Sequence, residues 1–290
     1  MSIRFDNQVA IVTGAGLGLG RSHAIGLAER GAKVVVNDLG GARDGSGEGS
    51  TSPADKVVQE ITQMGGEAVA NHDNVATKEG GENIVKTAVD AFGRVEILIN
   101  NAGILRDKSF LKQDAGTWNA VIDVHLNGAY YVTRPAIKVM RENGYGRIVM
   151  TTSAAGLYGN FGQTNYTAAK MGIVGLMNSL KIEGKNKDIL VNTIAPAAAS
   201  RLTEDLMPKD LLEKMKPEFV APLVVYLCSD RCDTTGRIYN AGMGYYNRAA
   251  MLTGRPVQLS DGEDMATVET IHENFENINK LEGAVELGDG

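Results

Sequence analysis

The chain has 290 residues, of which 43% are hydrophobic and 22% are charged, and its formal net charge is −6. This length and composition suit one large α/β domain with a substantial core better than two domains. The negative balance argues against a surface for nucleic acid or for an anionic membrane, but it leaves room for a local basic pocket.

Short β-rich runs alternate with amphipathic stretches, which predicts a parallel sheet covered by helices on both faces, a doubly wound Rossmann-type α/β fold. The expected strands are Val9–Thr13, Lys33–Asp38, Glu67–Ala70, Val95–Ile99, Gly146–Thr151, Ile189–Ile194 and Arg237–Tyr239. The expected helices are Leu19–Arg30, Ala54–Met64, Lys78–Phe92 and two long ones around residues 115–142 and 164–185.

Two segments depart from this alternation. Residues 40–52 are rich in Gly and Ser, which predicts a mobile loop. Residues 246–290 contain one amphipathic helix within 261–281 and no new strand–helix unit. We expect a main domain over residues 1–245, with 246–290 as a C-terminal extension that packs on this domain or on a dimer partner.

The cysteines and the chain ends indicate a soluble intracellular protein. Cys228 and Cys232 form no paired framework, which suits a reducing compartment, and without a second pair or a nearby histidine we expect no metal site. Met1–Asp6 leads directly into an apolar strand, so we expect no signal peptide. No apolar run reaches the roughly 18–20 residues of a membrane span.

Four glycines follow the first strand: Gly14, Gly16, Gly18 and Gly20. Glycine there permits a tight turn, close approach of the backbone to a pyrophosphate, and close packing of helix on strand. The helix that begins near Leu19 offers free N–H groups to the phosphates. The pattern predicts a dinucleotide site that includes Leu19, and a flexible turn without a ligand is the alternative.

Asp38 ends the second strand about twenty residues further on, as the dinucleotide pattern requires. A carboxylate there accepts hydrogen bonds from the ribose hydroxyls and repels a 2′-phosphate, which favours NAD over NADP. Arg43 could neutralise a 2′-phosphate instead, and a structural Asp38 that caps the following turn is the other alternative.

Two further groups follow strand ends that open onto the same crevice. Asp73, Asn74 and Val75 are placed to contact the adenine edge, and Asn101, Ala102 and Gly103 follow the fourth strand. Each group alone is compatible with turn chemistry. Together with the glycines they predict a dinucleotide cradle.

Ser153, Tyr166 and Lys170 form the predicted catalytic set. Tyr166 and Lys170 are four residues apart on a helical stretch, so their side chains project from one face and both also border the cofactor. We expect the ammonium group to favour the phenolate, which then takes a proton from an alcohol as hydride leaves. Ser153 would polarise and orient the reacting oxygen, since no His–Asp partners that would activate it as a nucleophile are evident.

Asn127 is a polar residue within the long central helix, where it could hold a water that extends a proton path from Lys170. A helix-bending asparagine with a satisfied side chain is the alternative. His23, His72, His125 and His272 are dispersed without ligand spacing, and each is interpreted as structural or exposed.

Over about residues 6–245 the chain resembles the classical short-chain dehydrogenase/reductase family. The motifs that carry the resemblance are Thr13–Gly20, Asn101–Gly103, Asn127, Ser153, Tyr166 and Lys170. The family implies the roles given above. It also implies a loop near the nicotinamide after the sixth strand, where Pro196 is a predicted cofactor contact, although Ala195-Pro196-Ala197 lacks the Pro-Gly of many members.

Several stretches look like the dehydrogenase unit of peroxisomal multifunctional enzyme type two: Val36–Gly41, Asn101–Asp107, Tyr158–Gln163 and Val220–Val224. The tail also resembles that unit's extension. The resemblance implies NAD-dependent oxidation of (3R)-3-hydroxyacyl-CoA to 3-ketoacyl-CoA in fatty-acid β-oxidation, a part of lipid metabolism. The unit's hydratase and sterol-carrier-like domains are absent, which implies a stand-alone cytoplasmic bacterial enzyme or a fragment of a peroxisomal one.

The substrate prediction has alternatives. Arg106, Lys108, Lys112 and Arg201 could neutralise the CoA phosphates, or they could form a solvated face. A 17β-type hydroxysteroid dehydrogenase remains open, and so does a 3-oxoacyl-carrier-protein reductase, which Asp38 disfavours because that activity usually uses NADPH. A non-catalytic NAD-binding regulator would be expected to have lost Ser153, Tyr166 or Lys170.

The resemblance further implies a homo-oligomer that pairs through the helices around 115–142 and 164–185, where Leu176 and Leu180 lie. We expect a homodimer, with a tetramer as the alternative.

Overall fold

A computed structural model describes the chain except for residues 1, 43, 47–51, 199–213 and 287–290. The chain divides into two compact units, Met1–Arg248 and Ala249–Gly290. Arg43, Arg201 and much of the Gly/Ser-rich segment, all named above, lie outside the described residues.

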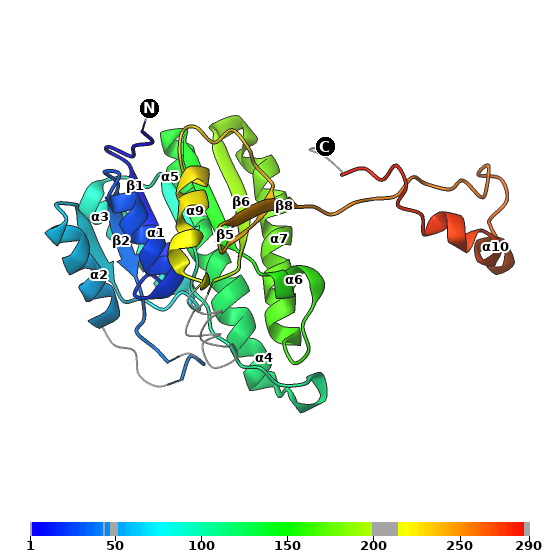
Figure 1. The fold of residues 1–290 in the computed structure, drawn as a ribbon, viewed down its shortest axis with the longest axis horizontal. Helices are drawn as coiled ribbons and strands as arrows, with labels where there is room; N and C mark the ends of the chain where they lie inside the picture. The colour runs from blue at the N-terminus through cyan, green and yellow to red at the C-terminus, as the bar shows by residue number, and fades with distance from the viewer. Residues whose placement is uncertain (1, 43, 47–51, 199–213, 287–290) are drawn as a thin grey trace. The chain divides into compact units, whose positions relative to one another are not determined.

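The first unit is built on an eight-stranded sheet with the order β3-β2-β1-β4-β5-β6-β7-β8 (Figure 1). The strands are β1 Val9–Thr13, β2 Lys33–Asn37, β3 Ala68–Asn71, β4 Ile97–Asn100, β5 Gly146–Thr151, β6 Ile189–Pro196, β7 Ile238–Gly242 and β8 Tyr245–Ala249. The pairs from β3 to β7 are parallel. The predicted doubly wound fold is confirmed, and β8, which follows β7 after two residues, is an addition to the strands predicted from the sequence.

Helices cover both faces of this sheet (Figure 1). On one face α1 (Gly18–Ala28) contacts α2 (Ser52–Gln63) and α9 (Ala221–Leu227). On the other, α5 (Gly128–Asn143) contacts α3 (Lys78–Phe92) and α7 (Thr164–Gly184). The sequence did not predict α9 or the five-residue helix α6 (Ala154–Tyr158).

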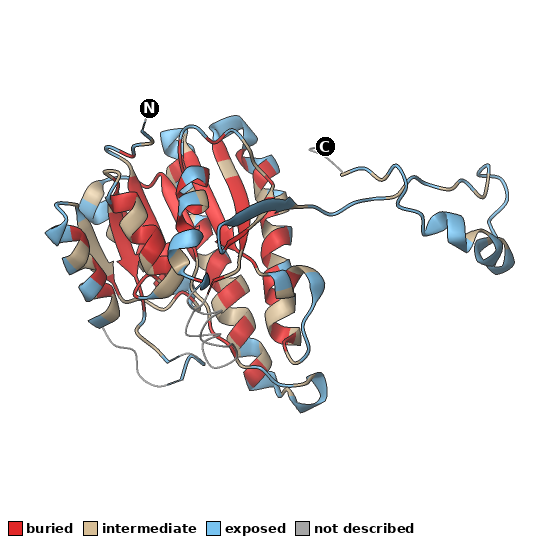
Figure 2. Cartoon of the chain, viewed as in Figure 1, coloured by how far each residue is buried: buried red, intermediate tan, exposed pale blue. Residues whose placement is uncertain are grey.

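The core lies between these layers (Figure 2). All residues of β1, β4 and β5 are buried, as expected for central parallel strands that are covered on both faces. Ile97, Leu98 and Ile99 have no exposed surface. Each such side chain contributes roughly 1.5–3 kcal/mol by leaving water, which fixes the strands that carry the site.

The long helix predicted around residues 115–142 is interrupted. Helix α4 (Ala115–Ile122) passes into a π-helical turn, Asp123–Asn127, before α5 begins. A π-helical turn inserts an extra residue into the helix and rotates the side chains that follow, and such turns often occur at functional sites. The continuous helix of the prediction is therefore corrected.

The second unit contains helix α10 (Val268–Ile278), within the range where an amphipathic helix was predicted. An antiparallel bridge pairs Thr253 with Val285. The apolar face of α10 carries Val268, Ile271 and Phe275, and no residue of α10 is buried.

Candidate functional site

The strands β1 to β5 all end in polar residues, and these ends meet at one edge of the sheet. The residues are Thr13, Asn37, Asn71, Asn100 and Thr151. A cleft of about 590 Å³ opens there, at the point between β1 and β4 where the strand order reverses. Ligands of open α/β sheets bind at such a reversal.

Most of the predicted site residues line this cleft. They are Gly14, Gly18, Leu19, Asp38, Asp73, Asn74, Val75, Asn101, Ala102, Gly103, Ser153, Tyr166, Lys170 and Pro196. Gly16, Gly20 and Asn127 do not contribute to its wall. The structure thus brings together residues from seven separate segments of the sequence.

The glycines of the turn differ in their surroundings. A Cβ at Gly20 would lie 2.2 Å from the carbonyl oxygen of Gly14, so glycine is needed there for α1 to approach β1. Gly18 has a φ of +54° and no atom within 4 Å of a Cβ placed on it. Gly18 therefore leaves open space in the cleft wall at the start of α1, where a phosphate can approach the helix N-terminus.

Asn101, in the loop that follows β4, binds this loop to the glycine turn. Its side-chain Nδ2 donates to the carbonyl oxygens of Thr13 and Gly14 at 3.0 and 3.1 Å. The Thr13 hydroxyl oxygen accepts from the N–H groups of Asn101 and Ala102 at 3.0 and 3.1 Å. The Nδ2 group of Asn101 is thus bound to the glycine turn, and Asn101, Ala102 and Gly103 line the cleft.

Asp38 is buried at the end of β2 and combines two of the roles weighed from the sequence. One carboxylate oxygen accepts from the Gly16 N–H at 2.8 Å, and the other accepts from the Gly40 N–H at 2.7 Å, which caps the following turn. Each oxygen keeps a further lone pair. Because Asp38 also lines the cleft, it can still accept hydrogen bonds from a ligand.

Asp73 is held in a polar network beside Asp38. Its carboxylate accepts from Asn71 Nδ2 at 2.7 Å and from Asn83 Nδ2 at 3.2 Å. The Asn37 side chain links β2 to this network through Asn71 at 2.8 Å. These bonds give the end of the cleft a fixed set of polar groups.

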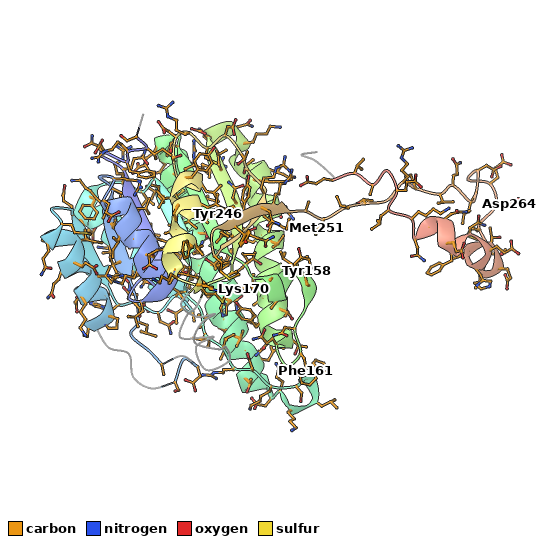
Figure 3. All side chains as sticks on the ribbon, in the orientation of Figure 1. Tyr158, Phe161, Lys170, Tyr246, Met251 and Asp264 are labelled. Carbon is orange, nitrogen blue, oxygen red and sulfur yellow. The ribbon has the colours of Figure 1, made fainter. Side chains whose placement is uncertain are left out.

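Tyr166 and Lys170 lie together on α7, as predicted, with the Lys170 Nζ 5.6 Å from the centroid of the Tyr166 ring. The Nζ also donates to the carbonyl oxygen of Thr151 at 2.7 Å, which fixes the amine at the end of β5. Ser153 is the N-cap of α6 and accepts from the Ala155 N–H at 3.2 Å. Figure 3 shows Lys170 inside the α/β body, whereas Tyr158, the last residue of α6, and Phe161, which lies just after α6, are exposed.

Burial controls the protonation of this set. It raises the pKa of Tyr166, the hydrogen bond with Ser153 lowers that pKa, and the charge of Asp107 raises it. Burial also lowers the pKa of Lys170 to about 7, so the amine can gain or lose a proton near neutral pH. Among these causes the hydrogen bond with Ser153 is the one that lowers the pKa of Tyr166. The effect of the Lys170 ammonium group on the phenol stays a prediction.

Asn127 lies in the π-helical turn with its Nδ2 donating to the Asp123 carboxylate at 2.8 Å. This geometry matches the alternative of a satisfied, helix-bending asparagine. A role for Asn127 in a proton path stays a prediction.

His125, interpreted as structural from the sequence, lines the cleft in the structure. Its ring meets the Tyr166 ring edge to face at a centroid distance of 5.2 Å, and its Nε2 lies 2.8 Å from the Ile104 carbonyl oxygen. Burial is the main cause that holds its pKa well below the ordinary value, so the imidazole is neutral. Its position two residues before Asn127 was the only signal in the sequence.

Gln163 is a second residue that the sequence reasoning missed. It is buried, it lines the cleft, and it lies three residues before Tyr166. Its proximity to the Tyr166 motif was visible in the sequence, but its partner Asp107 comes from another loop.

No group of three or more His, Cys, Asp or Glu side chains is placed to hold a metal ion among the residues that the structure describes. Within the same residues, no helix is both long enough and apolar enough to cross a membrane.

Comparison with known proteins agrees with this geometry. The family model described as short chain dehydrogenase matches residues 8–210. The peroxisomal multifunctional enzyme type 2 of Mus musculus is 51% identical over 276 residues, which cover 95% of this chain but only 37% of that enzyme. This chain therefore spans well under half the length of that relative.

Two solved structures are also similar. A short chain dehydrogenase from Mycobacterium avium has a TM-score of 0.81 and 38% identity, with coverage of 94% of this chain and 95% of that one. A 7α-hydroxysteroid dehydrogenase complexed with NADH and 7-oxo glycochenodeoxycholic acid has a TM-score of 0.75 and 28% identity, with coverage of 83% and 95%. The chain belongs to the short-chain dehydrogenase family and is an enzyme of the dehydrogenase type.

Proposed function

We propose that the protein oxidises (3R)-3-hydroxyacyl-CoA to 3-ketoacyl-CoA, with NAD as hydride acceptor and Tyr166 as general base. The observation that carries the proposal is that the Tyr166 phenol, Ser153 and Lys170 line the same cleft as the glycine turn and Asp38. The name of the mouse relative, a peroxisomal multifunctional enzyme, supports the acyl-CoA assignment.

The choice of NAD rests on Asp38. The site fits a dinucleotide because Gly18 leaves open space beside the N-terminus of α1, where a side chain would stand in the way. The carboxylate of Asp38 at the end of β2 would accept hydrogen bonds from the ribose and repel a 2′-phosphate. Bound NAD supplies the carbon that accepts the hydride.

The protein's own residues manage the proton. Burial keeps the Tyr166 phenol protonated at neutral pH, and Ser153 offsets part of this effect. The phenol must lose its proton before it can accept the hydroxyl proton of the alcohol. With a pKa of about 7, Lys170 can take up or release a proton at neutral pH beside the ring. Lys170 would take the phenol proton, and the resulting phenolate would accept the hydroxyl proton of the alcohol, while NAD, when bound, would supply the acceptor for the hydride.

The basic residues proposed to bind CoA phosphates differ in their exposure and in their hydrogen-bond partners. Arg106 lines the cleft, although its Nε donates to the Asp44 carbonyl oxygen at 2.7 Å. Lys108 is engaged by Asp114 at 3.0 Å and by Thr117 at 3.2 Å. Lys112 is exposed on the 3-10 turn Phe110–Lys112. Arg106 and Lys112 are therefore the better candidates for phosphate contacts.

Steady-state kinetics with the two enantiomers of 3-hydroxybutyryl-CoA test the proposal. We expect a higher kcat/KM for the 3R isomer with NAD, and little turnover with NADP. A higher kcat/KM for the 3S isomer, or for a free hydroxysteroid, would overturn the substrate assignment. The Tyr166→Phe variant is the control that separates enzymatic turnover from background reduction of NAD.

A hydroxysteroid dehydrogenase is the second candidate, and the similarity to the 7α-hydroxysteroid dehydrogenase structure favours it. A steroid has no CoA moiety, so removal of the Arg106 charge should not change the kcat/KM for steroid oxidation. If Arg106→Ala raises the KM for the acyl-CoA substrate and leaves the KM for its pantetheine thioester unchanged, the acyl-CoA assignment is supported.

We also propose a homodimer that pairs through α5 and α7, where Leu176 and Leu180 are half-buried in the single chain. The exposed apolar face of α10 supports the proposal that residues 246–290 pack on the main domain or on a partner. Sedimentation that shows only monomers at micromolar concentration would contradict the dimer. We propose a cytoplasmic location for a bacterial source and a peroxisomal one for a eukaryotic source.

A further inference from the structure

The side chain of Gln163 is held at both ends. Its Nε2 donates to an Asp107 carboxylate oxygen at 2.8 Å, and its Oε1 accepts from Asn160 Nδ2 at 2.9 Å. The Asp107 contact joins the loop after β4 to the segment after α6, and the Asn160 contact lies within that segment. The two segments are also joined by the hydrogen bond from the Lys108 N–H to the Gly162 carbonyl oxygen at 2.9 Å. The amide therefore has a fixed orientation.

A primary amide has two N–H donors and two lone pairs. Among the described residues, Asp107 takes one of the N–H groups and Asn160 fills one lone pair. One donor and one lone pair remain, on a buried side chain that lines the cleft. A side chain that is fixed in orientation and keeps a spare donor is suited to recognise a ligand oxygen.

This amide lies close to the reacting phenol. Gln163 is the N-cap residue of α7, three residues before Tyr166, and both side chains line the cleft. Asp107, which Gln163 contacts directly, is near enough to the phenol for its charge to raise the pKa of Tyr166. A substrate whose hydroxyl meets Tyr166 therefore places its neighbouring atoms near the Gln163 amide.

We propose that Gln163 is a specificity-determining residue whose free N–H group binds a second substrate oxygen. That oxygen is carried by the carbon two positions away from the carbinol carbon. This inference rests on the proposed function, in which that atom is the thioester carbonyl oxygen of a 3-hydroxyacyl chain. Asp107 and Asn160 act through the amide, whose orientation they fix. An alcohol without the second oxygen gains nothing from Gln163.

Two CoA derivatives of the same length separate this role from a structural one. One is (3R)-3-hydroxybutyryl-CoA, and the other is the matching thioether, (3R)-3-hydroxybutyl-CoA, in which a methylene replaces the carbonyl. The measured quantity is the ratio of kcat/KM for the thioester to that for the thioether, within one preparation. This ratio does not depend on the fraction of folded enzyme.

The test variant is Gln163→Met, which keeps the length of the side chain and removes both amide groups. We expect the ratio to fall about tenfold, the effect of one neutral hydrogen bond. Asp107→Ala, at an exposed position, releases one end of the amide and should lower the ratio by a smaller factor. Where thioether turnover is too slow, inhibition constants for acetoacetyl-CoA and its thioether analogue give the same ratio.

The outcomes separate the two proposals. A wild-type enzyme that does not oxidise the 3R thioester refutes the proposed function and this inference with it. A wild-type enzyme that oxidises it, with a ratio unchanged in Gln163→Met, refutes the role of Gln163 and leaves the proposed function standing. If Gln163→Met cannot be obtained folded, an unchanged ratio in Asp107→Ala has the same meaning.

Discussion

Substitution by alanine should have different effects at two glycines of the same turn: mainly a loss of stability at Gly20 and mainly a loss of NAD affinity at Gly18. A Cβ at Gly20 would lie 2.2 Å from the Gly14 carbonyl oxygen and 2.6 Å from Asn101 Nδ2, so the turn or the β4 loop must move. Overpacking of this kind against backbone costs about 3 kcal/mol. For a domain of this size that corresponds to a fall in Tm of about 6–12 °C.

Gly18→Ala meets no protein atom within 4 Å and retains only the strain of its φ of +54°. That strain is about 1 kcal/mol, or a fall in Tm of about 2–4 °C. Its methyl group would instead occupy the space that we assign to the phosphates, so the Kd for NAD should rise at least about tenfold.

Thermal unfolding and titration with NAD, followed by calorimetry, measure both effects. The account predicts that Gly20→Ala has the larger loss of Tm and that Gly18→Ala binds NAD weakly while it remains folded. A Gly18→Ala variant with unchanged affinity for NAD would refute the assignment of the phosphate position. A Gly20→Ala variant as stable as the wild type would refute the packing argument.

Three further predictions concern charge and protonation. Asp38→Asn removes the repulsion of a 2′-phosphate, so the ratio of kcat/KM for NAD to that for NADP should fall by about tenfold or more. An unchanged ratio would contradict the role of Asp38 in cofactor specificity. The pKa of Lys170 is about 7 in the folded protein and near 10.5 in the unfolded chain, so the unfolded state binds more protons between these values. The free energy of unfolding of the cofactor-free protein should therefore rise as the pH increases from 7 to 8.5, and thermal unfolding of Lys170→Met should show no such rise. An identical pH dependence in both proteins would contradict the burial of the amine. Ser153→Ala removes the hydrogen bond that lowers the pKa of Tyr166, so the acidic limb of the kcat profile for oxidation should move to higher pH, and a profile that falls in amplitude without moving would argue against this role.

Most of the residues that local sequence patterns singled out line one cleft in the structure, and their roles there stay predictions. The four glycines, Asp38 and the Tyr166–Lys170 spacing each rest on contacts between residues close in the chain or on the end of one strand. The strand positions followed because buried parallel strands are short apolar runs bounded by turns. The order of the strands then brings their ends to one edge, which explains why distant motifs meet.

The rest depends on contacts that no local pattern reveals. The π-helical turn Asp123–Asn127 adds one residue to a helix whose apolar period looks continuous, and this shift turns His125 toward Tyr166. Gln163 gains its fixed orientation from Asp107, fifty-six positions earlier in the chain. The protonation of Lys170 likewise depends on burial by the surrounding fold, which the sequence alone does not determine.

Replacement of Tyr166 by phenylalanine tests the central claim most directly, because it removes one oxygen and leaves the aromatic ring that packs against His125. The account predicts that kcat falls by about a thousandfold or more, while Tm stays close to the wild-type value and the Kd for NAD stays within about threefold. Turnover at the wild-type rate in this folded, NAD-binding variant would contradict the role of the phenol as the proton-transferring group.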